Sequence, residues 1–168
     1  MGLFALLIIG ACQNEHGKNY NNATRVDEDG LALIKNGLEG GITEIKASGL
    51  AITNSTNQRV ISFAKMMIDD HTKAGDELKK IEKDKMVEEK DTIASNHLKM
   101  ITGLSKQSGP AFDRAYMQMM VTDHESAVEL FTNGIKNTDD EIKGFAAKTL
   151  PTIQMHLDSA KAILASLK

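Results

Sequence analysis

The feature of this sequence that most constrains its fold is an internal repeat. Residues 63–74 match residues 116–127 in an aromatic residue, a Met-Met pair, an aliphatic residue, an Asp-His pair and an alanine, at identical spacing. In both copies the apolar residues recur at three- and four-residue steps, which is the pattern of an amphipathic helix. The repeat therefore predicts two related helices in a bundle that is built from two similar helical hairpins.

Helical periodicity continues along the chain from about residue 29 onward. Polar turns with helix-capping residues, or a Ser-Gly-Pro break, separate the periodic segments. We predict an all-α fold, a four-helix bundle with a short extra helix in the connection between the second and third long helices. Pro151 falls inside the last helix and predicts a kink there. The expected helices are 29–54, 57–82, 92–105, 111–136 and 140–167.

The beginning of the chain resembles a bacterial lipoprotein signal. An apolar run over residues 3–9 is too short to span a bilayer, and it is followed by Gly-Ala-Cys, with Cys12 the one cysteine of the chain. Cleavage before Cys12 would leave its thiol to carry lipid, although residues 1–4 lack the usual positive charge and an ordinary buried thiol is the alternative. The predicted division is a signal peptide over 1–11, an Asn-rich flexible tether over 12–27 and the bundle domain over 28–168.

Three of the five histidines fall within the apolar arcs of predicted helices. At about 100° per residue, His71, His124 and His156 all point toward the core of the bundle. In an up-and-down bundle their heights agree to within about one helical turn, so the imidazoles can converge in one layer. Buried imidazoles need partners for both ring nitrogens, which a metal ion or a shared hydrogen-bond network supplies. His97, on the short helix, is expected to be exposed or locally bonded.

Glu44 is the candidate fourth metal ligand. It lies outside the polar sector of its helix, beside small residues, although a carboxylate at the edge of the core that reaches water is the alternative. Three imidazoles and a carboxylate suit zinc, iron or copper. The di-iron pattern requires two Glu-x-x-His motifs, but Ile68 and Val121 stand three residues before His71 and His124. We therefore do not expect ferroxidase chemistry.

Four further residues accompany the histidines of the repeat. Met67 and Met120 lie four residues before them, where soft thioethers would favour copper, although methionine is also a common core residue. Asp70 and Asp123 immediately precede the histidines, at the edge of the apolar arc. Such carboxylates can orient an imidazole on another helix, or they can be ordinary solvated aspartates.

Charge and motifs limit the classes of function. The net charge is only -3 and no segment concentrates Lys and Arg, which argues against a nucleic-acid partner. No nucleophile motif, phosphate loop or Cys/His catalytic pair is visible, so we assign no catalytic residue. A metal-binding protein and a structural or protein-binding module with a buried histidine network both remain open. A metal-dependent enzyme would further need an open coordination position and a cleft.

The motifs together resemble one exported bacterial family. They are Phe63-Ala with Met67 and Asp70-His71, then Phe112-Asp113 with Tyr116, Met120-Val121 and Asp123-His124, and last Leu150-Pro151 with His156-Leu157. That family is of unknown function, has a ferritin-like bundle and is often labelled "predicted outer membrane protein". The resemblance, over about residues 28–168, implies a four-helix fold, three motif histidines and a cell-envelope location, periplasmic or at the outer membrane. Anchoring through Cys12 would make the membrane a partner. The resemblance implies no activity.

Overall fold

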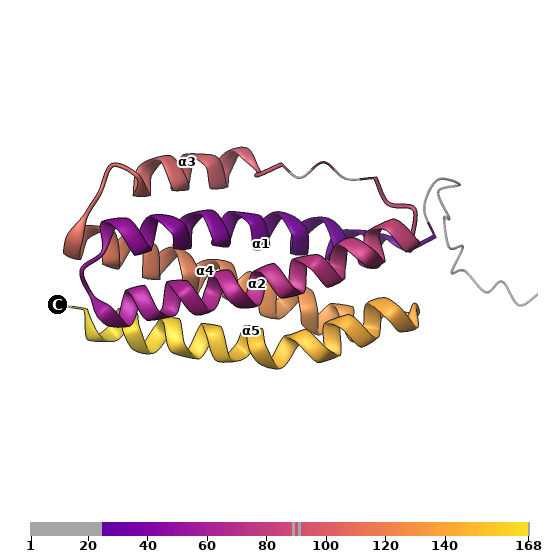
Figure 1. Ribbon diagram of the computed structural model, residues 1–168. Helices are drawn as coiled ribbons and strands as arrows, with labels where there is room; N and C mark the ends of the chain where they lie inside the picture. The colour runs from indigo at the N-terminus through magenta and orange to yellow at the C-terminus, as the bar shows by residue number, and fades with distance from the viewer. Residues whose placement is uncertain (1–24, 89, 91, 168) are drawn as a thin grey trace, which may run out of the picture.

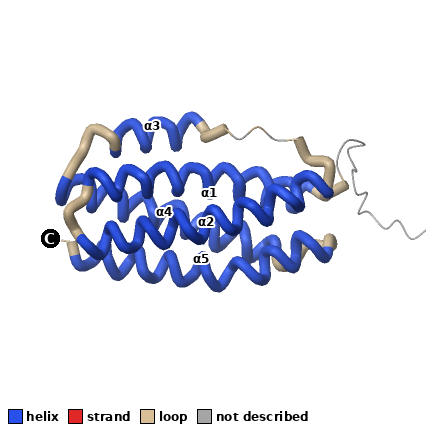
Figure 2. Tube along the Cα trace, viewed as in Figure 1, coloured by secondary structure: helices blue, strands red, loops and turns tan. Residues whose placement is uncertain are grey.

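The computed structural model describes residues 25–88, 90 and 92–167, and within them it contains five helices and no strand (Figures 1 and 2). None of these helices is long and apolar enough to cross a membrane. The predicted signal peptide, Cys12 and almost all of the predicted tether lie outside the described residues.

The helices fall close to the predicted ranges. Both ends of every helix lie within three residues of the prediction, and α5 continues through Pro151 as one helix. Three of the long helices begin at side chains that cap their first turn: Asp27, Asn57 and Asp139 each accept a hydrogen bond from a backbone N–H of that turn. The helices are α1 (Glu28–Asn54), α2 (Gln58–Asp84), α3 (Ser95–Leu104), α4 (Gly109–Gly134) and α5 (Asp140–Ser166).

The four long helices lie side by side in a four-helix-bundle-like arrangement, and α3 runs along the outside of α1 (Figure 1). The connection between α2 and α4, which includes α3, returns along the length of the bundle. As a result α2 and α4 point in the same direction, and so do α1 and α5 (Figure 1). The up-and-down order assumed for the histidine heights was therefore wrong, because this connection is long enough to cross the whole bundle. The ferritin-like relationship stays a prediction.

The apolar core is divided into two clusters by a polar layer. One cluster includes Phe63 and Tyr116, and the other includes Leu78 and Phe145. The four predicted ligand residues lie between the positions that belong to the two clusters: Glu44 on α1, His71 on α2, His124 on α4 and His156 on α5. The fold thus brings the four predicted ligand residues to one level of the bundle.

Candidate metal centre

Glu44 and the three core histidines come from the four different long helices. His124, His156 and Glu44 are buried, with at most 4% of their surface exposed, and His71 is half-buried. The helix directions explain why they meet. His71 and His124 follow the first residues of the parallel helices α2 and α4 by 13 and 15 positions, whereas Glu44 and His156 both precede the last residues of α1 and α5 by 10 positions.

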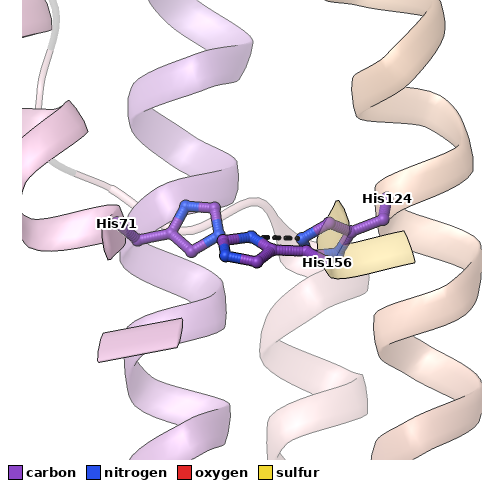
Figure 3. Close-up of side chains that lie close together, drawn as sticks. All are labelled: His71, His124 and His156. Carbon is purple, nitrogen blue, oxygen red and sulfur yellow. Dashed lines mark hydrogen bonds between the residues drawn. The ribbon is translucent and has the colours of Figure 1, made fainter. Parts of the chain in front are cut away.

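The three imidazoles converge closely enough to share one ion. One ring nitrogen of each histidine lies within 4.8 Å of the corresponding nitrogens of the other two. Figure 3 shows the rings directed toward one another, and their centroids are 5.4–5.7 Å apart. Glu44 is outside this group of three nitrogens but contacts two of its members, with Oε2 at 2.8 Å from Nε2 of His71 and Oε1 at 3.2 Å from Nδ1 of His124. The predicted convergence of the three histidines is confirmed.

The hydrogen-bond partners of two histidines determine which ring nitrogens carry hydrogen. Nδ1 of His124 lies 2.9 Å from the carbonyl oxygen of Met120, and Nε2 of His156 lies 3.2 Å from Oδ2 of Asp70. Both oxygens are acceptors, so each of these nitrogens donates. The other nitrogens, Nε2 of His124 and Nδ1 of His156, face each other at 3.4 Å. In the neutral rings both carry a lone pair, and the pair requires a proton or a metal ion between them.

Burial and charge set the protonation of this layer. Burial alone would raise the pKa of Glu44, but the charges of the histidines, His71 foremost, lower it to about 2. Burial opposes the charge on His71, yet the Glu44 carboxylate raises its pKa above the usual value. Burial lowers the pKa of His124, and it lowers that of His156 to about 4. The layer therefore favours a charged His71 paired with the Glu44 carboxylate, and at neutral pH His124 and His156 are neutral, so no proton bridges their facing nitrogens.

His71 pairs with Glu44 through Nε2, which is shielded from solvent. This nitrogen lies 2.8 Å from Oε2 of Glu44, a distance that makes an ion pair, but it has no geometric hydrogen-bond partner among the described residues. A metal ion can take the place of the proton that this ion pair requires. Together with the facing nitrogens of His124 and His156, His71 makes the residues present compatible with a metal ion.

A cavity of about 570 Å³ opens onto this layer. His71, His156 and Glu44 line it, and so do the apolar side chains of Phe131 and Phe145. The sequence showed no cleft, although a signal was present: Gly40, Gly41, Ala74 and Gly75 leave the facing surfaces of α1 and α2 without bulky side chains where they line the cavity.

Comparison with known proteins gives a family but no activity. The family model described as "Domain of unknown function (DUF4142)" matches residues 17–163. The chain belongs to this family. No curated protein matches the chain. A solved structure, the "DUF305 fragment from Deinococcus radiodurans", is similar with a TM-score of 0.75 and 14% sequence identity, over 84% of this chain and 99% of that chain. At this identity the similarity shows the fold alone.

The residues beside the histidines in this DUF4142 domain differ in their contacts. Asp70 lies 3.2 Å from His156 on another helix, as the carboxylate interpretation expected. Met67 and Met120 are fully buried in the apolar cluster with Phe63, as their alternative interpretation as core residues would place them. Met120 offers its backbone oxygen to the site.

His97 was missed as part of the polar centre. It is half-buried because α3 packs against α1 and α4, and its Nδ1 lies 2.8 and 3.0 Å from the two oxygens of Glu39 on α1. Its Nε2 lies 3.9 Å from Oδ1 of Asp123 on α4. The expectation of an exposed or locally bonded histidine was therefore wrong. Periodicity on a helix of ten residues carries no information about which long helices it will contact.

Proposed function

We propose that the protein binds a transition-metal ion through His71, His124 and His156, with Glu44 as the fourth protein ligand. The observation that carries the proposal is the pair of unprotonated nitrogens of His124 and His156 at 3.4 Å. Two nitrogens bound at about 2.0–2.1 Å to one tetrahedral zinc ion are about 3.3–3.4 Å apart. Three imidazoles and a carboxylate suit zinc, and they also suit iron or copper.

The groups behind the ligands support the same proposal. A metal-bound histidine almost always donates its second ring N–H to a carboxylate or a backbone carbonyl, which fixes the ring and makes the ligating nitrogen more basic. Asp70 stands in this relation to His156, and the Met120 carbonyl stands in it to His124. A bound ion would supply Lewis acidity and charge at the inner end of the cavity. No group that reacts with a substrate is evident, so we propose binding rather than catalysis.

A buried polar network without metal is the second candidate, and the His71–Glu44 ion pair favours it. In this case the histidines would fix the register of the helices, and the module would act structurally or through protein partners. The network has one weakness: at neutral pH it contains no donor between the facing nitrogens of His124 and His156.

Metal content separates the two candidates. The full chain is stripped with a chelator and dialysed separately against zinc, copper and iron, and the bound metal is measured by elemental analysis. We expect one tightly held equivalent that is lost in a His124→Ala/His156→Ala double variant, with circular dichroism to verify that the variant remains helical. A Met67→Leu variant is the control for a change in the adjacent apolar core, and it should keep the bound metal. If the wild type retains none of the three metals, the metal proposal is wrong.

We also propose that lipid on Cys12 anchors the protein in the cell envelope, at the outer membrane or facing the periplasm. The apolar run and the Gly-Ala-Cys sequence at residues 10–12 support this proposal. The test is mass spectrometry of the protein from a membrane fraction of a lipoprotein-processing bacterium. We expect a mature chain that begins at a diacylated Cys12 and a Cys12→Ala chain that is neither lipidated nor cleaved there. An unmodified Cys12 in the wild type would contradict the proposal.

A further inference from the structure

A second group of metal-ligating side chains lies beside the histidine layer and uses none of its residues. Glu39 on α1, His97 on α3 and Asp123 on α4 all line the same cavity as His71 and His156. Three helices therefore converge here as well. The only part of the group adjacent in sequence to the histidine layer is Asp123, which precedes His124.

Glu39 holds the imidazole of His97 in one orientation. Both oxygens of Glu39 lie within 3.0 Å of Nδ1 of His97, and the backbone N–H of Ala94 donates to Oε1 of Glu39 at 2.8 Å. Because the carboxylate accepts, Nδ1 carries the hydrogen, and Nε2 of the neutral ring carries a lone pair. This is the arrangement in which a carboxylate positions a histidine to bind a metal ion through the other nitrogen.

Nε2 of His97 lies near the carboxylate of Asp123, one oxygen of which has no hydrogen-bond partner among the described residues. Nε2 lies 3.9 Å from Oδ1 of Asp123, a separation at which one cation can contact both atoms. Oδ2 of Asp123 is shielded from solvent and has no hydrogen-bond partner among the described residues. A buried carboxylate oxygen without a partner is costly, and a cation is the group that would satisfy it.

The charge of the cavity favours a cation over any other ligand. Five carboxylates line it, and no Lys or Arg is among the described residues of its lining. The five are Glu39, Glu44, Asp70, Asp123 and Glu129. Low-dielectric walls that carry charges of one sign concentrate ions of the opposite sign.

We propose that His97 and Asp123 form a second site for a divalent transition-metal cation, next to the histidine layer and open to the same cavity. Nε2 of His97 and the carboxylate of Asp123 are its protein ligands, and Glu39 is a positioning residue for the imidazole. With two protein ligands the ion keeps coordination positions for water. It is therefore held more weakly than an ion at the four-residue centre.

The test is zinc stoichiometry on the full, metal-stripped chain by isothermal titration calorimetry. The wild type should bind two equivalents, the second at least tenfold more weakly. Asp123→Asn and His97→Gln should each lose the weaker equivalent and keep the tighter one. Glu129→Gln is the matched control, because it removes one negative charge from the lining of the same cavity at an exposed side chain, six positions after Asp123 on α4. It should bind both equivalents.

Two results would overturn the second site. The first is that Asp123→Asn and His97→Gln bind two zinc equivalents, as the wild type does. His97 would then only hold α3 against the bundle through ion pairs. One equivalent, lost in His124→Ala but retained in Asp123→Asn, would leave the histidine centre as the only site. Conversely, a single equivalent that is lost in Asp123→Asn and retained in His124→Ala would support the second site and contradict the proposed function. The two proposals therefore fail separately.

Discussion

Replacing Glu44 with glutamine tests the electrostatics of the polar layer directly. The side chain is 6% exposed, and its two oxygens lie 2.8 Å from His71 and 3.2 Å from His124. Glutamine keeps the shape of the side chain and removes the charge. His71 then loses the carboxylate that raises its pKa, and because burial opposes its charge, the variant loses the stabilisation that the ion pair provides.

The size of the effect follows from the pKa of Glu44. Its pKa falls from 4.5 to about 2 on folding, and each unit is worth about 1.36 kcal/mol, so the ionised carboxylate stabilises the metal-free protein by roughly 3 kcal/mol at pH 7. The raised pKa of His71 reflects the same interaction and is not added. Since the folded-state pKa is depressed, the contribution is complete above the unfolded value of 4.5 and is lost as the pH falls toward 2. At about pH 3.5 roughly 2 kcal/mol remains.

The assay is urea unfolding of the metal-stripped chain, followed by circular dichroism at about pH 7 and about pH 3.5. Glu44→Gln should lower the free energy of unfolding by roughly 3 kcal/mol at the higher pH and by less at the lower. Glu77→Gln is the control, because it breaks an exposed ion pair with Lys148 and should change stability by less than about 1 kcal/mol. A Glu44→Gln loss below about 1 kcal/mol at pH 7, or one that does not shrink in acid, would refute this reasoning.

Three further substitutions test the positioning of the site and the packing of the bundle. Asp70→Asn should weaken zinc affinity about 10- to 100-fold, because it weakens the hydrogen-bond acceptor for Nε2 of His156. The assay is a competition titration with a chelator. Unchanged affinity would mean that Asp70 is an ordinary helix-face aspartate. Gly134→Ala would place a methyl group against Cδ1 of Leu33 and should lower the free energy of unfolding by about 1–3 kcal/mol in urea. Gly144→Ala, whose added methyl meets no atom within 4 Å, should instead stabilise α5 by up to about 1 kcal/mol. Equal effects of the two alanines would contradict the packing argument.

The helices and the histidine layer were predictable because both depend on local periodicity. A residue such as His124 falls on the apolar arc of its helix whatever that helix packs against, so its inward direction could be read from the sequence. Glu44 was recognisable for the same reason, as a charge outside the polar sector. The prediction that these residues meet at one level of the bundle depended on more than periodicity. It is correct although the assumed helix order was wrong, because the histidines of α2 and α4 lie near the middle of helices of similar length.

The contacts made by α3 could not be predicted from periodicity. Glu39 belongs to the polar sector of α1 and reads as solvated, yet α3 covers it and His97 binds it. Whether Glu39 is solvated or covered depends on how the connection between α2 and α4 crosses the bundle, and no local sequence pattern determines that path. The pairing of Asp70 with His156 is similar: the type of contact could be expected, but its partner depends on the relative rotation of α2 and α5.

The two histidines of the repeat occupy equivalent positions on α2 and α4 but have different surroundings, and the difference suggests how an ion would reach the centre. His124 is fully buried, donates to the Met120 carbonyl and does not line the cavity, so it is a fixed ligand. His71 lines the cavity, is half-buried, and has a ring nitrogen without a hydrogen bond. An ion that enters through the cavity therefore meets His71 and His156 first.

The proton on His71 competes with the metal ion, because the Glu44 carboxylate stabilises that proton. We accordingly expect the metal affinity to rise with pH as the His71 proton is released. Zinc titrations of His71→Gln at several pH values should show a lower zinc affinity that depends less steeply on pH than that of the wild type. An equally steep pH dependence in His71→Gln would show that the competing proton is held elsewhere.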